Sequence, residues 1–176
     1  MSGHSSLAHS LHRPCWGCQH YGGLTIGTDT DTAWCAKHKQ ARPGVSGCSS
    51  FEPSTRQPMR MLVCGGRDYS DRRAAFEALD RVLTKRRVVL VIHGAARGGD
   101  TLADEWAQAR EIERLPFEVT REEWRRIGPS AGPKRNARML AEGRPDGVVA
   151  LPGGRGTEDM VMQALAAGLP VWRPLG

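Results

Sequence analysis

The chain has 176 residues, of which 39% are hydrophobic, and a formal net charge of +6. This length suits one medium domain, or a smaller domain joined to a short module. No apolar run approaches the roughly 20 residues of a membrane span, and the Ser- and His-rich start lacks the apolar core of a signal peptide. We therefore expect a cytoplasmic protein, and the scattered positive charge permits a nucleic-acid partner without requiring one.

The cysteines divide the chain into two parts. Four of the five cysteines lie before Ser49, and the rest of the chain has a single one. We expect residues 1–13 to be a disordered tail because they are small, polar and aperiodic. Residues 14–52 would form a Cys-rich module, residues 53–58 a polar linker with two prolines, and residues 59–176 a larger α/β domain.

The Cys-rich module has the pattern expected of a metal site. A C-x2-C pair, followed by two more cysteines, provides four thiolates for a tetrahedral structural Zn²⁺. The module has too few large apolar residues to fold by burial alone, and a cytoplasmic location disfavours disulfides. An iron–sulfur cluster is the alternative, and a structural or protein-docking role is expected. The predicted ligands are Cys15, Cys18, Cys35 and Cys48, with His20 and His38 in reserve.

The C-terminal domain alternates short apolar runs with amphipathic stretches. Such alternation predicts right-handed crossovers and a mainly parallel, Rossmann-like sheet with helices on both faces. Ser70 and Asp100 are expected to cap the helices that follow them. The predicted strands are Met59–Cys64, Val88–Ile92, an edge strand within Glu113–Val119, Asp146–Leu151 and Pro170–Trp172. Helices are expected after Ser70 and Asp100, as a turn at Glu122–Ile127, and over Lys134–Glu142 and Glu158–Ala167.

Three glycine-bearing segments follow predicted strands: Gly65–Asp68, His93–Asp100 and Pro152–Thr157. Ligands of parallel sheets bind at the carboxyl ends of the strands. Glycines let the backbone approach a ligand, and a helix start favours an anion. A single glycine turn is weak evidence, but three at one sheet edge predict a phosphate-binding pocket for a nucleotide.

Charged and polar residues lie near these segments in the sequence, and their side chains suit contacts with a nucleotide. Lys134 and Arg135 could neutralise phosphate, Asn136 could contact a base or ribose, and Asp68 could accept a ribose hydroxyl. His93 is as readily a packing residue as a ligand contact. The full predicted ligand-binding set is Gly65, Gly66, Arg67, Asp68, His93, Gly94, Arg97, Gly98, Lys134, Arg135, Asn136, Pro152, Gly153, Gly154, Arg155, Gly156 and Thr157.

Four motifs in order resemble the YspA/YpsA-related branch of the SLOG superfamily. They are Cys64-Gly-Gly-Arg-Asp-Tyr69, His93-Gly-Ala-Ala-Arg-Gly-Gly-Asp100, Ala131-Gly-Pro-Lys-Arg-Asn136 and Pro152-Gly-Gly-Arg-Gly-Thr157. The resemblance implies a Rossmann-like fold and binding of nucleotides or nucleotide-derived signals, often in phage-defence or stress settings. It also implies a possible homodimer. It does not extend to the Cys-rich module.

The superfamily also includes DprA and the Lonely Guy phosphoribohydrolases, whose motif is Pro-Gly-Gly-x-Gly-Thr-x-x-Glu with a catalytic Glu. Met160 occupies that position here, and Glu158 and Asp159 are displaced by about 100° per residue on a helix. The resemblance therefore favours binding or sensing of a nucleotide. An N-glycosidic hydrolase, with Asp68, Asp100 or Glu158 as the catalytic carboxylate, is the alternative, and nucleic-acid binding is the second.

Overall fold

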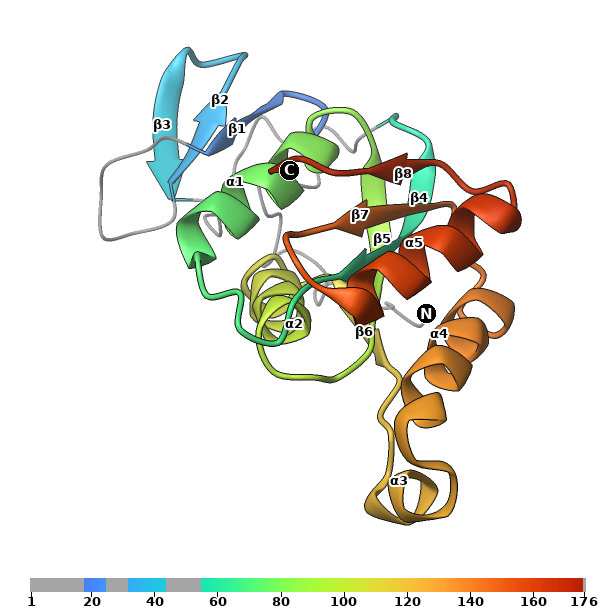
Figure 1. The fold of residues 1–176 in the computed structure, drawn as a ribbon. Coiled ribbons are helices and arrows are strands. Elements are labelled where there is room, and N and C mark those ends of the chain that lie inside the picture. The colour runs from blue at the N-terminus through green and yellow to red at the C-terminus, as the bar shows by residue number, and fades with distance from the viewer. Residues whose placement is uncertain (1–17, 25–31, 44–54, 176) are drawn as a thin grey trace, which may run out of the picture. The chain divides into compact units, whose positions relative to one another are not determined.

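The computed structural model describes residues 18–24, 32–43 and 55–175. The chain divides into two compact units. One unit comprises Met1–Gln57 with Leu83–Arg87, and the other comprises Pro58–Val82 with Val88–Gly176. Figure 1 shows the elements of each unit. Among the described residues, no helix is both long enough and apolar enough to cross a membrane.

The N-terminal unit contains a small antiparallel sheet. Its strands are β1 (Tyr21–Leu24), β2 (Thr32–Cys35) and β3 (Gln40–Pro43), in the order β1-β2-β3. The Arg56 guanidinium donates hydrogen bonds to the carbonyls of Cys18, Gln19 and Tyr21, at 3.0, 3.2 and 3.2 Å. This arginine therefore ties the end of the predicted linker to the turn that precedes β1. The predicted tail, and Cys15 and Cys48, lie outside the described residues.

The C-terminal unit is built on a five-stranded parallel sheet, which confirms the predicted fold class. The strand order is β6-β5-β4-β7-β8. The strands are β4 (Pro58–Cys64), β5 (Arg87–His93), β6 (Glu113–Pro116), β7 (Gly147–Ala150) and β8 (Val171–Trp172). The helices are α1 (Arg72–Leu83), α2 (Gly99–Ala109), α3 (Arg121–Ile127), η2 (Gly128–Ser130), α4 (Ala131–Ala141) and α5 (Arg155–Ala166).

Helices cover both faces of this sheet, with α1 and α2 on one side and α4 and α5 on the other (Figure 1). Strand β4 supplies both cores because successive side chains point to opposite faces. Leu62 and Cys64 join the cluster that contains Met139 of α4 and Met160 of α5. Met61 and Val63 are fully buried and alternate with them. The run Met59–Cys64 thus reads as a central strand because it is apolar at nearly every position.

A buried ion pair joins the two helices of the first face. The carboxylate of Asp80 on α1 accepts hydrogen bonds from Arg110 Nε at 3.1 Å and Arg110 Nη2 at 3.0 Å. Trp106 Nε1 of α2 donates to the same carboxylate at 3.2 Å. All three side chains are buried. The pair is therefore bidentate and sealed from water.

Two predicted helix caps are wrong. The helix α1 is capped by Asp71 rather than Ser70, because Asp71 Oδ1 accepts a hydrogen bond from Ala74 N at 2.9 Å. The helix α2 begins at Gly99 with Gly98 at its N-cap position, and no side chain caps it. Asp100 therefore lies inside the first turn of α2, where its carboxylate has a different role.

Candidate ligand-binding site

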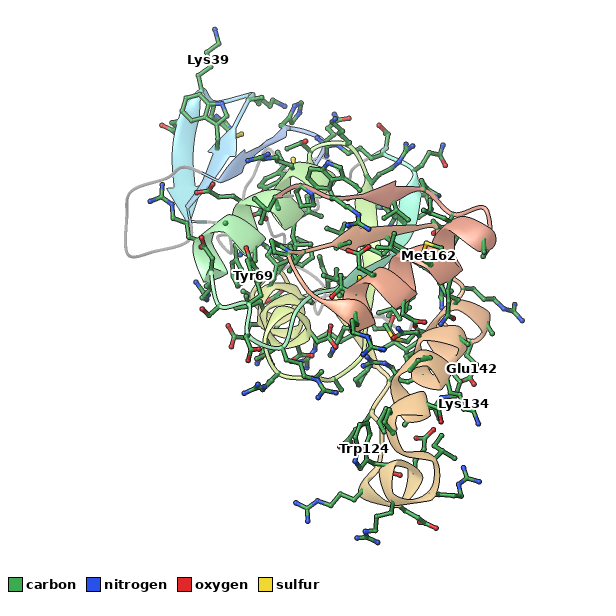
Figure 2. The ribbon with its side chains drawn as sticks, viewed as in Figure 1. Lys39, Tyr69, Trp124, Lys134, Glu142 and Met162 are labelled. Carbon is green, nitrogen blue, oxygen red and sulfur yellow. The ribbon has the colours of Figure 1, made fainter. Side chains whose placement is uncertain are left out.

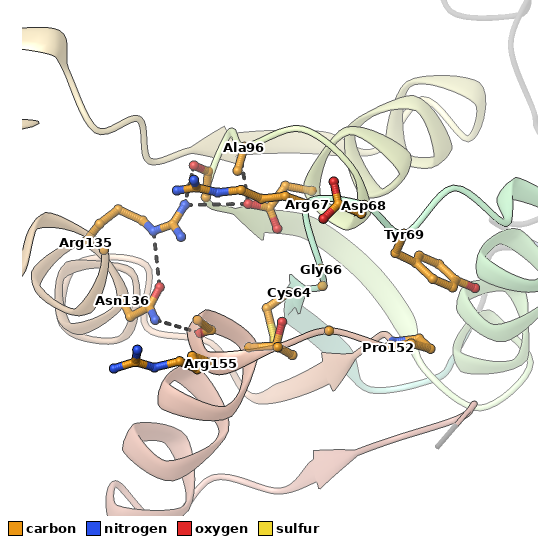
Figure 3. Close-up of a pocket in the computed structure, with 18 of the residues that line it drawn as sticks. Cys64, Gly66, Arg67, Asp68, Tyr69, Ala96, Arg135, Asn136, Pro152 and Arg155 are labelled. Carbon is orange, nitrogen blue, oxygen red and sulfur yellow. Dashed lines mark hydrogen bonds and ion pairs between the residues drawn. The ribbon is translucent and has the colours of Figure 1, made fainter. Parts of the chain in front are cut away.

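A cavity of about 560 Å³ opens at the carboxyl ends of β4, β5 and β7. The strand order reverses between β4 and β7, and ligands of open parallel sheets bind at such a switch point. Figure 3 shows the cavity. Its lining residues come from the end of β4, from the loops after β4, β5 and β7, from the first turns of α2 and α5, and from α4. They are Cys64, Gly65, Gly66, Arg67, Asp68, Tyr69, Gly94, Ala96, Asp100, Gly132, Pro133, Arg135, Asn136, Met139 and Pro152–Thr157.

Backbone hydrogen bonds join the three strand-end loops. Gly66 N donates to Pro152 O at 2.9 Å, and Gly66 O accepts from Gly99 N at 3.0 Å. The three loops are thus connected through the peptide groups of one residue. Gly98 has φ 79°, and a Cβ there would lie 2.6 Å from Arg67 O. Only glycine tolerates both the conformation and this approach.

The glycines of the site fall into two groups. At Gly65, Gly99 and Gly153 an added Cβ would meet another loop at 2.9, 2.6 and 2.6 Å. These glycines are needed for packing between loops. At Gly132, Gly154 and Gly156 an added Cβ would meet no atom within 4 Å. Because all three line the cavity, they mark where the backbone is open to a ligand.

The open glycines Gly154 and Gly156 lie at the start of α5. Gly154 is the N-cap residue, and no side chain caps the helix. The first N–H groups of an α-helix have no intrahelical acceptor, and the helix dipole favours negative charge there. Thr157, buried in the first turn of α5, also lines the cavity. This wall of the cavity is suited to an anionic group.

A cation lies on the α4 wall of the cavity. The Arg135 guanidinium donates to Gly94 O and, through Nε, to Asn136 Oδ1 at 3.1 Å. Asn136 in turn donates from Nδ2 to Gly156 O at 3.2 Å and to Asp159 Oδ2 at 2.7 Å. The Asn136 amide therefore holds Arg135 and the start of α5 in place, so its hydrogen-bonding groups are largely used within the protein.

Asp100 lies against Arg135 inside the cavity. Its Oδ2 is 3.5 Å from Arg135 Nη1 and accepts a hydrogen bond from Ala96 N at 3.2 Å. Its side chain is 6% exposed. Burial raises the pKa of the Asp100 carboxyl above its ordinary value, and the positive charge of Arg135 opposes that rise. Burial also lowers the pKa of Arg135.

Three more charged residues lie at the mouth of the cavity. Arg67, Asp68 and Arg155 are exposed and line it. Asp68 Oδ1 accepts a hydrogen bond of 2.6 Å from Arg97 Nη2, so the two side chains form an ion pair. Asp68 thus reaches the cavity already paired with a residue of the neighbouring loop, while Arg97 itself is outside the lining.

Some predicted residues do not line the cavity: His93, Arg97, Gly98, Lys134 and Glu158. His93 is 3% exposed. Its Nδ1 accepts from Ala95 N at 3.3 Å, and its Nε2 lies 3.0 Å from Asp104 Oδ1. Burial lowers the pKa of His93, and Asp104 opposes the effect. This geometry assigns the proton of a neutral imidazole to Nε2 and makes His93 a packing residue beneath the loop.

Lys134 and Glu158 point elsewhere. Lys134 is exposed on α4, where Figure 2 labels it. Glu158 forms an exposed ion pair with Arg173, with O–N distances of 2.6 and 2.8 Å. The side-chain hydrogen bond from Arg173 lowers the pKa of Glu158. Of the three carboxylates considered for catalysis, only Asp68 and Asp100 therefore reach the cavity.

Several lining residues were not predicted: Cys64, Tyr69, Ala96, Gly132, Pro133 and Met139. Cys64 and Met139 are part of the core cluster and also form an apolar wall of the cavity. Burial raises the pKa of the Cys64 thiol to about 12, so this cysteine is not a nucleophile near neutral pH. The sequence around Cys64 and Met139 is that of ordinary core residues, so it gives no sign that they line a cavity.

Met160 is fully buried in the core cluster. The third residue after Thr157 therefore faces the sheet instead of the cavity. A carboxylate at this position would be buried among apolar side chains in this chain.

The described part of the Cys-rich module contains two of its four predicted ligands. Cys18 and Cys35 are buried, at 8% and 9% exposed, and are not joined in a disulfide. Within residues 18–24, 32–43 and 55–175, no group of three or more His, Cys, Asp or Glu side chains could hold a metal. Because the other two cysteines lie outside this part of the chain, the zinc site stays a prediction.

Two comparisons with known proteins find relatives of this chain. Residues 59–126 match the family described as YspA, cpYpsA-related SLOG. The chain is 37% identical over 117 residues to Gene 61 protein of Mycobacterium phage D29. The aligned region covers 64% of this chain and 93% of the phage protein. No solved structure is significantly similar. With this profile match, a relative matched over nearly its whole length, and a Rossmann-like sheet, the chain belongs to the YspA, cpYpsA-related SLOG family.

Proposed function

We propose that the C-terminal domain binds a nucleotide-type ligand in the cavity at the carboxyl ends of β4, β5 and β7. The observation that carries this proposal is the pair of open glycines, Gly154 and Gly156, at the uncapped start of α5. Membership of the SLOG family suggests a nucleotide-related function. A phosphate there would accept hydrogen bonds from the free N–H groups of α5.

The remaining groups of the cavity suit the rest of a nucleotide. Arg155 supplies positive charge in the first turn of α5, and Arg135 supplies it on the α4 wall. Met139 and Cys64 offer an apolar wall against which a base or ribose would pack. Asp68 lies at the mouth, where a carboxylate would accept a ribose hydroxyl.

A glycine substitution tests the phosphate position without disturbing the fold. Gly156→Ala places a methyl group in open space within the first turn of α5, and alanine in a helix is more stable than glycine by roughly 1 kcal/mol. We expect folding to be unchanged or improved while ligand affinity falls roughly tenfold or more. Calorimetric titration with AMP, ADP-ribose, NAD and cyclic nucleotides measures this effect.

The matched control is Lys134→Ala, which removes a cation from α4 outside the cavity lining. Its affinity should equal that of the wild-type protein. Absence of binding for every nucleotide at millimolar concentration, or equal binding by wild type and Gly156→Ala, would contradict the proposal.

One observation favours a second candidate function, cleavage of an N-glycosidic bond. Asp100 is a buried carboxyl with a raised pKa that lines the cavity. A buried carboxyl of this kind can serve as a general acid or base. The test is release of free base from a nucleotide: Asp100→Asn should abolish it, while Asp68→Asn should retain most of it. No release by the wild-type protein would exclude the activity for the nucleotides tried.

For the N-terminal unit, we propose a structural Zn²⁺ held by Cys15, Cys18, Cys35 and Cys48, with a protein-docking role. The burial of Cys18 and Cys35 supports it. Metal analysis of the purified chain should find about one zinc per chain. Cys15→Ser and Cys48→Ser should lose both the metal and the order of this unit. Iron with a brown colour on anaerobic purification would point instead to an iron–sulfur cluster.

A further inference from the structure

Arg67 stands out among the charged residues of the cavity. Its side chain is exposed and lines the cavity, and it reaches over toward Arg135 on one wall (Figure 3). Within the part of the chain that the structure describes, no hydrogen bond or ion pair to Arg67 is found, whereas Arg97 of the next loop is paired with Asp68. Arg67 is thus a cation held at the cavity without a protein partner.

The two guanidinium groups repel one another. Burial is the largest cause of the lowered pKa of Arg135, and the positive charge of Arg67 adds to it. Asp100 contacts Arg135 at a single distance of 3.5 Å, and no ion pair between Asp100 and Arg67 is found in the described part of the chain. Placing two cations together at a cavity wall costs free energy unless an anion lies between them. The arrangement is therefore suited to a bound anionic group.

This second cationic wall is separate from the α5 start. Figure 3 shows Arg67 and Arg135 on one side of the cavity and Arg155, in the first turn of α5, on the other. A single phosphate on the open glycines would leave Arg67 unpaired. A ligand with a further phosphate would satisfy both walls at once, because a guanidinium binds phosphate oxygens in a planar, two-point contact.

We propose that the cavity is selective for nucleotides with two phosphate groups, and that Arg67, together with Arg135, binds the second one. This inference rests on the proposed function, since it assigns the first phosphate to the start of α5. Arg67 is then the residue that determines specificity. The phosphates are either adjacent, as in a nucleoside diphosphate, or carried on different ribose oxygens.

The experiment compares AMP with ADP and with adenosine 3′,5′-bisphosphate by calorimetric titration, without added magnesium. We expect at least one bisphosphorylated ligand to bind roughly tenfold more tightly than AMP, the size of one charge-assisted contact. The variant Arg67→Gln should reduce that ratio to near one. The control Arg97→Gln removes a neighbouring exposed arginine outside the lining and should preserve the ratio. Comparison of ADP with the 3′,5′-bisphosphate tells adjacent from separated phosphates.

The outcomes separate the two proposals. If AMP binds and loses affinity in Gly156→Ala, but neither bisphosphorylated ligand binds more tightly, the inference about Arg67 is wrong and the proposed function stands. An undiminished ratio in Arg67→Gln also overturns it. If none of the three nucleotides binds, the inference about Arg67 fails, and titration with ADP-ribose, NAD and cyclic nucleotides then decides whether the proposed function fails with it.

Discussion

Two Asp–Arg pairs in the C-terminal unit differ in almost every property except their chemistry. Asp80 and Arg110 form a bidentate contact between α1 and α2, with side chains 4% and 0% exposed. Asp100 and Arg135 approach at a single distance of 3.5 Å, with side chains 6% and 15% exposed. The first pair lies in the packed interior, whereas the second lines a cavity.

The two pairs differ in how many of their hydrogen-bonding groups are used within the protein. This difference distinguishes a structural ion pair from one that can bind a ligand. The carboxylate of Asp80 is satisfied by Arg110 and by Trp106 Nε1, so little capacity is left for another group. Arg135 divides its donors between Gly94 O and Asn136 Oδ1 and keeps only a loose contact with Asp100. A charged group that is incompletely paired beside a cavity can gain free energy from a ligand.

The largest effect is expected at the sealed pair. Asp80→Ala leaves the Arg110 charge buried without a partner, which should lower the free energy of unfolding by about 3–5 kcal/mol. Denaturant unfolding of the variant measures the loss. Loss of less than about 1 kcal/mol would show that Arg110 finds solvent or another acceptor, and the contrast between the pairs would disappear.

At the Asp100–Arg135 pair, a substitution should change ligand affinity more than it changes the free energy of unfolding. Asp100→Asn keeps the shape of the side chain and an acceptor for Ala96 N, but removes a negative charge beside Arg135. We expect a change in unfolding free energy of about 1 kcal/mol or less and a several-fold gain in affinity for a phosphate-bearing ligand. A stability loss as large as that of Asp80→Ala would mean that both pairs are structural.

The Asp100 carboxyl should also make the stability of the fold depend on pH. Because burial raises the folded-state pKa of Asp100, its protonated form stabilises the fold. This contribution is complete below the unfolded pKa of about 3.9 and is lost as the pH rises through the raised folded pKa. Wild type should therefore lose stability relative to Asp100→Asn over that interval. Thermal unfolding of both proteins from pH 3 upward tests this, and parallel curves would contradict it.

The smallest effect is expected at His93, which lies beneath the cavity loop. Its folded pKa is lowered mainly by burial, against the opposing charge of Asp104. The neutral form stabilises the fold fully above the unfolded pKa of about 6.5, and this stabilisation is lost as the pH falls through the folded pKa. His93→Gln should flatten this acid-side loss in thermal melts without altering ligand affinity. A change in affinity at neutral pH would place His93 in the binding site.

Most of the C-terminal fold could be predicted because its three central strands, β4, β5 and β7, are largely apolar. β4, β5 and β7 are each bounded by a glycine or a charged residue, and alternation with helices then determines a parallel sheet. Cap positions were less predictable. Gly98 occupies the N-cap of α2 because it packs against the loop after β4. The capping preference of Asp100, which led to the wrong prediction, contains no information about that contact.

The candidate site could be located from its glycines, but their separate roles could not be read. Gly153 and Gly154 are neighbours in sequence, yet one packs against Gly66 and the other faces open space. Likewise, one helical step of about 100° separates Lys134 outside the cavity from Arg135 inside it. Such distinctions depend on how loops pack against each other, which periodicity and composition do not contain.

The connection of three loops through Gly66 has a consequence for how relatives of this chain diverge. The hydrogen bonds to Pro152 O and from Gly99 N are made by main-chain groups, which do not depend on the side chains at the mouth of the cavity. The side chains at the mouth, such as Arg67 and Arg155, are exposed and take no part in these bonds. Single substitutions at the mouth of the cavity can therefore change ligand preference while the hydrogen bonds between the three loops are kept.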